Sequence, residues 1–216
     1  MKKYRFAVFD LDGTLLNTIE DLAAAVNFTL KKHGIPQRPV SEIKTFIGNG
    51  AAVLVAKSAG IGVDDPALTD MLEDFKDYYS LHSDVFTKPY EGIEYVIETL
   101  CENGIKCAIA SNKFDRAVKI INEKYFKGRF ETAIGEGNGI KRKPAPDMVF
   151  KAMEIMGADK DNTVYIGDSP VDIKVAKNCG IDCISVLWGF RPKQELIENG
   201  AQIMIEKAED MLKYFI

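Results

Sequence analysis

Short apolar segments with strand character recur along this chain, and amphipathic helical patterns separate them. These segments are Phe6 to Phe9, Lys106 to Ala110, Thr163 to Ile166, Cys183 to Leu187 and Ile203 to Ile205. Because a strand that is apolar on both faces has to be covered on both faces, this alternation is typical of a parallel sheet between two layers of helices. The pattern therefore predicts a doubly wound α/β domain.

The sequence indicates where two of the covering helices begin and end. The first spans about Tyr90 to Asn103 and ends at Gly104. The second begins with Pro170 and ends at Gly180, which matches the preference for proline at the first helical position and for glycine just past the last. We expect both helices to pack against the sheet.

A long helical stretch, residues 18–88, interrupts the alternation after the first strand. Its first helix has a capping-box-like start at Thr18 and Asp21, a second helix follows Gly50, and a third opens with Asp65 and Pro66. The stretch is too long for a single crossover helix. We therefore predict a core domain formed by residues 1–17 and 89–216, and a small helical domain formed by residues 18–88.

The balance of charge disfavours one class of function. Lys and Arg number 28 and Asp and Glu number 32, so the formal net charge is 28 − 32 = −4. A protein that coats nucleic acid is expected to carry a basic excess, and we therefore expect no nucleic-acid partner. A pocket for one small anion remains compatible with this charge.

Histidine and cysteine usage narrows the chemistry and the location further. The two histidines, His33 and His82, are too few and too isolated for a histidine metal site or a Ser-His-Asp triad. The four cysteines show no C-x-x-C spacing, and no apolar segment approaches the length of a membrane span. We expect reduced thiols, a cytoplasmic location and no membrane partner. The sequence carries no signal for an oligomeric state.

Polar and acidic side chains directly follow three of the predicted strands. They are Asp10 and Asp12, Ser111 and Asn112, and Asp168 and Asp172. In open α/β sheets, ligands bind at the carboxyl ends of the strands. Any one of these aspartates alone is more often a helix N-cap or a turn residue, but four carboxylates in one crevice repel one another unless a cation sits among them. Because oxygen ligands suit Mg²⁺, the sequence predicts a magnesium site.

Four motifs occur in order along the chain: Asp10-Leu11-Asp12-Gly13-Thr14-Leu15, Ser111-Asn112-Lys113, Lys143-Pro144-Ala145-Pro146 and Gly167-Asp168-Ser169-Pro170-Val171-Asp172. They resemble the four motifs of the haloacid dehalogenase-like superfamily, and the likeness spans essentially the whole chain. The resemblance implies a Rossmann-like core with a four-helix cap inserted just after the first motif. Within the superfamily, the chain is most similar to phosphoglycolate phosphatases and related small-molecule phosphatases.

The resemblance also implies roles for individual residues. Asp10 would be the nucleophile that forms an aspartyl-phosphate, and Asp12 would act as general acid and base. The side chains of Asp10 and Asp168 and the main-chain carbonyl of Asp12 would hold the metal. Ser111 and Asn112 would hydrogen-bond the phosphoryl oxygens.

The resemblance implies that Lys143 is a further catalytic residue, and we assign Asp172 a supporting role. Lys143 would compensate the phosphoryl charge, although a short charge run such as residues 141–143 is usually a solvated face. Its position immediately before Pro144-Ala145-Pro146 favours the site. Asp172 is favourable at a helix start for the helix dipole alone, and we expect it to orient a metal-bound water or Lys143.

Two other segments offer candidate groups for binding the substrate. Gly48-Asn49-Gly50 precedes a helix of the 18–88 stretch, whose exposed backbone N–H groups could hold an anion. Most Gly-x-Gly pairs are merely turns, and the resemblance is what favours binding. Arg191, at the end of a strand on the same edge, could steer anions or bind a substrate carboxylate.

These residues predict a Mg²⁺-dependent phosphatase that acts on a small phosphorylated metabolite such as 2-phosphoglycolate, with a mobile cap closing over the site. Sugar phosphates, nucleoside monophosphates and pyrophosphate remain open as substrates. A phosphosugar mutase would use the same Asp10 and Asp12, and a catalytically silent module would bind a phosphometabolite and signal through cap closure. Dehalogenation is disfavoured, because the dehalogenase branch lacks an acid where this chain has Asp12.

Overall fold

One six-stranded sheet forms the centre of the protein in the computed structural model, which describes residues 3–216. The strands lie in the order β5-β4-β1-β6-β7-β8, and each neighbouring pair is parallel. Their bounds are β1 Phe6–Phe9, β4 Lys106–Phe114, β5 Thr132–Glu136, β6 Thr163–Gly167, β7 Asp182–Val186 and β8 Ile203–Ile205. The predicted doubly wound parallel sheet is confirmed. Since β1 lies between β4 and β6, the chain reverses its direction across the sheet at the position where ligands bind in such folds.

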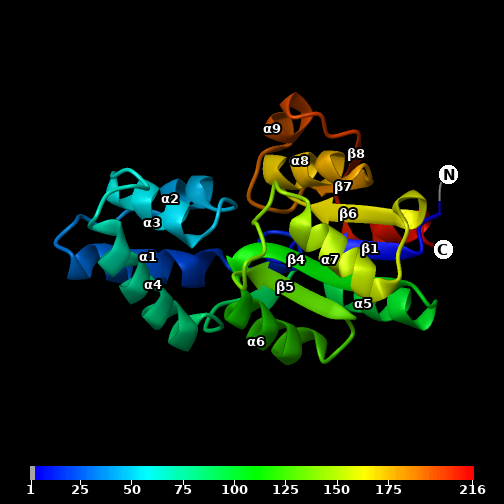
Figure 1. Ribbon diagram of the computed structural model, residues 1–216, viewed down its shortest axis with the longest axis horizontal. Coiled ribbons are helices and arrows are strands. Elements are labelled where there is room, and N and C mark those ends of the chain that lie inside the picture. The colour runs from blue at the N-terminus through cyan, green and yellow to red at the C-terminus, as the bar shows by residue number, and fades with distance from the viewer. Residues whose placement is uncertain (1–2) are drawn as a thin grey trace.

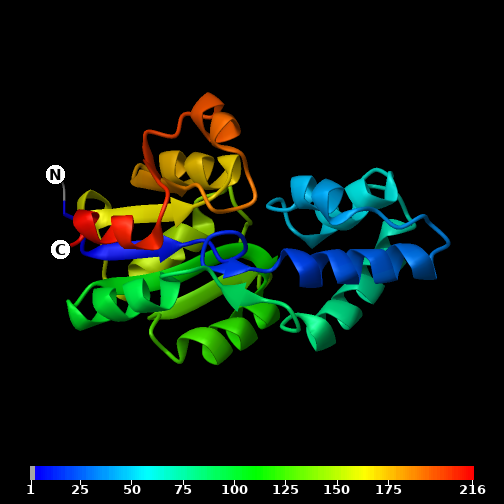
Figure 2. The same cartoon turned by 180° about the vertical axis from the view of Figure 1, so that it is seen from behind.

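Helices cover both faces of the sheet, which Figures 1 and 2 show from opposite sides. One face carries α5 Ile93–Glu102, α6 Asp115–Phe126 and the 3₁₀ helix η2 Ala208–Tyr214, and the other carries α7 Asp147–Met156 and α8 Pro170–Cys179. Two short helices lie in connections, namely η1 Lys160–Asn162 and α9 Lys193–Glu198. Within residues 3–216, no helix combines the length and the apolar character that a bilayer span requires.

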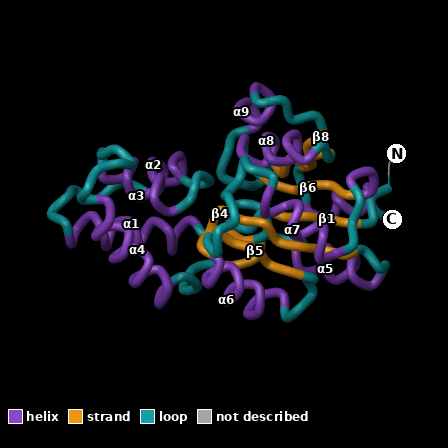
Figure 3. The backbone as a smooth tube through the Cα atoms, in the orientation of Figure 1, coloured by secondary structure: helices purple, strands orange, loops and turns teal. Residues whose placement is uncertain are grey.

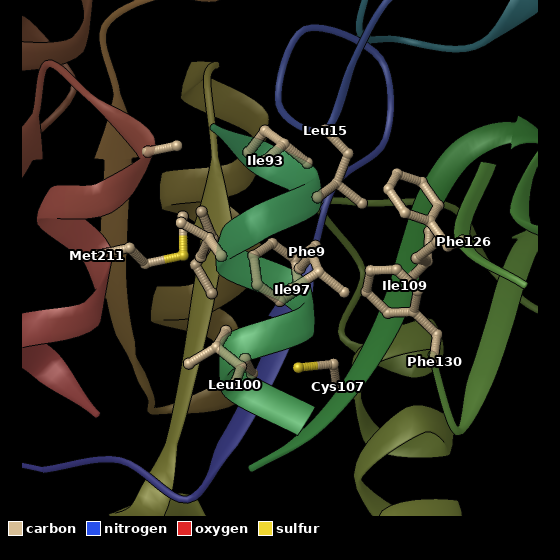
Figure 4. Packing of buried hydrophobic residues seen from close by; sticks show 14 of the residues in the cluster. Phe9, Leu15, Ile93, Ile97, Leu100, Cys107, Ile109, Phe126, Phe130 and Met211 are labelled. Carbon is tan, nitrogen blue, oxygen red and sulfur yellow. The ribbon is translucent and has the colours of Figure 1, made fainter. Parts of the chain in front are cut away.

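The core beneath α5 shows why the apolar strand pattern folds in this way. Phe9 of β1, Ile97 of α5, Ile109 of β4 and Met211 of η2 meet in one cluster and are fully buried (Figure 4). Burying a side chain of this size contributes about 1.5–3 kcal/mol. The packing holds β1 and β4 side by side, so that the polar residues following each strand emerge at the same edge of the sheet.

Four helices lie beyond this edge of the sheet (Figure 3). They are α1 Ile19–Lys32, α2 Val40–Phe46, α3 Ala51–Ala59 and α4 Leu68–His82. We call the stretch that carries them, residues 18–88, the helical insertion. They share an apolar cluster of their own that includes Leu30, Ile43 and Phe75. The two connections to the core pair as short antiparallel strands, β2 Leu16–Asn17 and β3 Lys88–Pro89.

Local structure differs from expectation at several points. The predicted capping box at Thr18 and Asp21 is wrong, because the Thr18 side chain caps nothing and its hydroxyl has no partner among residues 3–216. The Asp21 carboxylate instead accepts hydrogen bonds from the backbone N–H groups of Phe86 and Thr87. Asp21 thereby ties α1 to the segment that returns to the core. Sequence reasoning also missed β5 and α2, and it ended β4 four residues early at Ala110.

Candidate active site

Three buried carboxylates converge at the carboxyl ends of the central strands. Asp10 follows β1, Asp168 follows β6, and Asp172 lies in the first turn of α8. Each offers one oxygen, and these oxygens lie within 4.8 Å of one another. Carboxylates in such a group need a counter-charge, and their hard oxygen atoms suit a divalent cation. The arrangement could therefore bind a metal ion.

Burial sets the electrostatics of this group when no metal compensates it. Burial, opposed by the Lys143 ammonium and reinforced by the charge of Asp172, raises the pKa of the Asp10 carboxyl from its ordinary 3.8 to about 7. Burial and then the charges of Asp172 and Asp10 raise the pKa of Asp168 to about 8. A cation among these oxygens would favour their ionised forms, so the donor set fits a metal that would relieve the repulsion.

Lys143 is the cation that the protein itself brings to the group. Its Nζ lies 3.0 Å from Asp10 Oδ2 and 2.8 Å from Asp172 Oδ1, and it donates to the Tyr165 hydroxyl at 2.8 Å. Burial alone would lower the pKa of Lys143, but the charges of Asp10 and Asp172 hold it above its usual value. Asp172 is fixed in turn, because its Oδ2 accepts hydrogen bonds from the backbone N–H and the hydroxyl of Ser169. Both Asp172 oxygens are therefore engaged, one by Lys143 and the other by Ser169, and the expected role of Asp172 in orienting Lys143 stays a prediction.

Asp168 sits in a pocket that requires glycine beside it. Its oxygens accept hydrogen bonds from the Thr14 hydroxyl at 3.2 Å and from the Phe190 backbone N–H at 2.7 Å. A Cβ at Gly189 would lie 2.3 Å from the Asp168 Cβ, so a larger residue there would displace the carboxylate. Sequence reasoning assigned no role to Thr14 or Gly189. Thr14 lies within the first motif and could have been found from its spacing.

Asp12 stands apart from the three-carboxylate group. Its Oδ1 and Oδ2 accept hydrogen bonds from the Lys113 ammonium at 2.8 and 3.2 Å. The same ammonium donates to the hydroxyl of Tyr79, on α4 of the helical insertion, at 2.6 Å. Burial alone would lower the pKa of Lys113, but the charge of Asp12, the Tyr79 oxygen and the hydrogen bonds to both together hold this pKa above its usual value. Sequence reasoning gave Lys113 and Tyr79 no role.

A cavity of about 50 Å³ lies between the helical insertion and these polar groups. Its core-side lining includes Asp10, Asp12, Ser111, Asn112 and Lys113. The insertion contributes Leu22, Ile47, Gly48, Gly50, Ala51, Leu54, Phe75 and Tyr79. The cavity is therefore charged on the core side and mostly apolar on the insertion side, as is common for small-molecule sites.

The second motif runs along the last residues of β4, where side chains alternate between the two faces of the strand. Asn112 uses its amide to hold other segments: its Nδ2 donates to the carbonyls of Gly48 and Lys143, and its Oδ1 accepts from the Lys143 N–H. Ser111 is buried and lines the cavity. Direct contacts of Ser111 and Asn112 with a phosphoryl group stay predictions.

The candidate substrate-binding residues Gly48, Asn49, Gly50 and Arg191 divide between two places. Gly48 and Gly50 line the cavity, at φ +107° and +83°, whereas Asn49 and Arg191 line a neighbouring hollow. The Arg191 guanidinium donates to the carbonyls of Lys44 and Ile47 at 3.4 and 2.5 Å, so it holds the end of α2 against the core. A substrate-binding role for Arg191 stays a prediction that these contacts do not favour.

Comparison with known proteins places this arrangement in a family. The family model described as haloacid dehalogenase-like hydrolase matches residues 7–186. The chain is 33% identical to the phosphoglycolate phosphatase of Aquifex aeolicus, over 86% of each chain. It is 30% identical to phosphoglycolate phosphatase 1 of Pseudomonas aeruginosa, over 96% of this chain and 78% of that relative. The crystal structure of an inferred phosphoglycolate phosphatase from Lactobacillus delbrueckii subsp. bulgaricus superimposes with a TM-score of 0.93 and 36% identity, over 99% of each chain. The chain therefore belongs to the haloacid dehalogenase-like hydrolase family and lies close to its phosphoglycolate phosphatases.

Proposed function

We propose that this hydrolase is a Mg²⁺-dependent phosphatase that removes the phosphoryl group from a small phosphomonoester such as 2-phosphoglycolate, through an aspartyl-phosphate on Asp10. Its class, a phosphoric monoester hydrolase, follows from the family and from relatives about 30% identical along most of the chain. The observation that carries the proposal is the setting of Asp10. Its carboxylate lines the cavity and lies 3.0 Å from the buried Lys143 ammonium, beside two more carboxylates.

The residues around Asp10 support a two-step transfer. In the first step an Asp10 oxygen forms a bond to phosphorus while the ester P–O bond breaks, and Asp12 donates a proton to the leaving oxygen. In the second step water attacks the phosphorus of the acyl phosphate, Asp12 accepts a proton from that water, and the Asp10 carboxylate is released. Lys143 and Ser111 offset and orient the charge of the phosphoryl oxygens, since positioning and electrostatics dominate such transfers.

A magnesium ion fits the oxygen donors of the site. The side chains of Asp10 and Asp168 and the main-chain carbonyl of Asp12 would hold it. When bound, it supplies Lewis-acid stabilisation of the phosphoryl oxygens. The raised pKa values of Asp10 and Asp168 support this proposal, because one lysine, Lys143, does not fully compensate three buried carboxylates.

We also propose that the helical insertion, residues 18–88, is a cap that selects the substrate and excludes water. Its apolar residues cover the cavity, and its Gly48–Gly50 turn brings the start of α3 to the cavity wall. Exclusion of water strengthens electrostatic contacts to a phosphoryl group. The cap would therefore contribute to selectivity without supplying the attacking or metal-binding groups.

The test is phosphate release from p-nitrophenyl phosphate and from a panel of phosphometabolites, each with Mg²⁺ and with EDTA. We expect Mg²⁺-dependent release, the highest kcat/KM on a small acidic phosphomonoester, and a phosphorylated Asp10 peptide in acid-quenched enzyme by mass spectrometry. Conversion of a sugar phosphate into its isomer would favour the mutase alternative. Tight binding of a phosphometabolite with no turnover would favour the silent binding module.

A further inference from the structure

The Lys113 ammonium connects the sheet core with the helical insertion, although the proposed reaction uses groups of the core alone. It reaches Asp12 in the core and the Tyr79 hydroxyl on α4 of the helical insertion. Only 3% of the Lys113 side chain is exposed. Because a buried ammonium is costly unless it is paired and hydrogen-bonded, both acceptors are needed to keep the charge in this place.

The shortest contact of Lys113 with Tyr79 is the hydrogen bond to the hydroxyl group, and the ammonium also lies near the ring. Lys113 Nζ lies 2.6 Å from the Tyr79 oxygen and 4.5 Å from the centre of the ring. The ring is held on two sides, stacked on Phe75 at 5.6 Å and edge-on to Phe114 at 6.0 Å. The hydroxyl therefore occupies a defined position that depends on where α4 sits over the core.

The contact with Asp12 controls how that carboxylate is turned. Lys113 donates to both Asp12 oxygens, and Asp12 takes no part in the three-carboxylate group formed by Asp10, Asp168 and Asp172. A carboxylate held by one cation in this way keeps a fixed orientation, and Asp12 is one of the residues that line the cavity. Proton transfer needs such placement within hydrogen-bond reach of the leaving oxygen.

We propose that Tyr79 is a positioning residue of the reaction and acts through Lys113: its hydroxyl holds the ammonium against Asp12 only while the helical insertion lies over the core. The inference rests on the proposed function, in which Asp12 transfers the proton. When the insertion moves away, Lys113 loses one of its two acceptors and Asp12 loses its fixed orientation. Proton transfer is thereby restricted to the covered state of the site.

Two esters of similar shape make a direct test. Phenyl phosphate has a poor leaving group that needs a proton, whereas p-nitrophenolate leaves without one. We would measure kcat/KM with Mg²⁺ for both, because this ratio covers only the steps up to departure of the leaving group. Tyr79→Phe removes the hydroxyl and keeps the ring. We expect about a tenfold loss on phenyl phosphate and less than about a twofold loss on p-nitrophenyl phosphate.

A control and a double variant separate this role from general damage to the insertion. Tyr78→Phe removes a hydroxyl from the same helix, on a ring that stacks between Phe28 and His82 away from Lys113, and should change neither ester. Lys113→Met should lower phenyl phosphate hydrolysis further than Tyr79→Phe does. If Tyr79 acts through Lys113, then adding Tyr79→Phe to Lys113→Met should cause no further loss.

Each outcome separates the inference from the function on which it rests. If the wild-type protein hydrolyses both esters and Tyr79→Phe lowers both equally or neither, the positioning role is overturned and the phosphatase function stands. The role is also overturned if the Tyr79→Phe loss persists unchanged in the Lys113→Met background. No phosphate release from either ester by the wild-type protein would overturn the proposed function, and this inference with it. Because Tyr79→Phe keeps the packed ring, the test does not depend on whether Lys113→Met folds.

Discussion

The sheet core and the helical insertion bury their charges very differently. Six charged side chains are buried among residues 3–216, and five of them lie in the core: Asp10, Lys113, Lys143, Asp168 and Asp172. The insertion buries one, Asp21, and otherwise encloses an apolar cluster. Buried charge is costly unless it is paired or bound to a ligand. The core therefore holds its buried charges at the strand ends, where we propose the chemistry takes place, whereas the insertion buries mainly apolar side chains and lines the cavity.

The largest effect is expected from removing the proposed nucleophile, which tests whether the buried charges of the core carry out the chemistry. Asp10→Asn should lower kcat by at least about 10³-fold, because the variant cannot form the acyl phosphate. The fold should persist, since Lys143 keeps its bonds to Asp172 and Tyr165. Phosphate-release kinetics and a thermal unfolding scan would measure both. Asp70→Asn, at an exposed position on α4, is the matched control. Near wild-type turnover by Asp10→Asn would refute the nucleophile assignment.

Variants of Asp168 and Asp172 should differ in their apparent affinity for Mg²⁺. Asp168→Asn should weaken the apparent Mg²⁺ affinity by about 100-fold, and Asp172→Asn by about tenfold or less. The physical reason is that both Asp172 oxygens are already engaged, by Lys143 and by Ser169. Activity against Mg²⁺ concentration gives both affinities. The reverse order would mean that Asp172 is the metal ligand and Asp168 the supporting residue.

Changing the Gly48–Gly50 turn tests whether the insertion contributes to substrate selectivity. Gly48 has φ +107°, where a Cβ would be at least 4.0 Å from any neighbour, so Gly48→Ala adds backbone strain without a clash. Such strain costs about 1–2 kcal/mol. We expect kcat/KM on the preferred small substrate to fall by about tenfold, and that on p-nitrophenyl phosphate to change much less.

Gly34→Ala provides the control for that variant. Gly34 also has a positive φ, +71°, with open space around it, and it lies in the loop that follows α1, outside the cavity lining. It should affect stability alone. Equal losses on both substrates in Gly48→Ala, with the fold intact, would show that the turn has no part in selectivity.

The smallest expected effect is on the stability of the metal-free core. The pKa values of Asp10 and Asp168 rise from 3.8 in an ordinary carboxyl to about 7 and about 8 in the folded protein. Between the ordinary pKa of 3.8 and the raised values, the folded state binds more protons than the unfolded state, so the free energy of unfolding falls as pH rises. In EDTA, the Tm should drop by several degrees from pH 5 to pH 8, and Mg²⁺ should restore it most at pH 8.

Hydrogen exchange would sharpen this last prediction. The metal-dependent protection should be concentrated in the core strands β1 and β6, and the amides of α1 and α4 should change little at either pH. A Tm in EDTA that is independent of pH, or a loss confined to the insertion, would contradict the assignment of the three carboxylates as a group that Lys143 compensates only in part.

Much of the fold was predictable because its signals are local. Apolar segments such as Phe6 to Phe9 and Thr163 to Ile166 became the central strands, and Pro170 and Gly180 bounded α8 as expected. The short segment 132–136 escaped notice because its five residues include a glycine and two polar residues, and its strand pairing depends on β4. Strand formation at such a segment is decided by the neighbouring strand more than by intrinsic propensity.

The sequence by itself determined which groups are available at the site, and in what order along the chain, because motif spacing and the carboxyl ends of parallel strands are local properties. The tertiary structure decided which of these groups meet. Lys113 contacts residues 101 and 34 positions away, Arg191 binds carbonyls 147 and 144 positions away, and Asp21 holds backbone 65 and 66 positions on. These contacts depend on how the insertion packs over the core. The sequence pattern of one segment does not indicate which distant segment will pack against it.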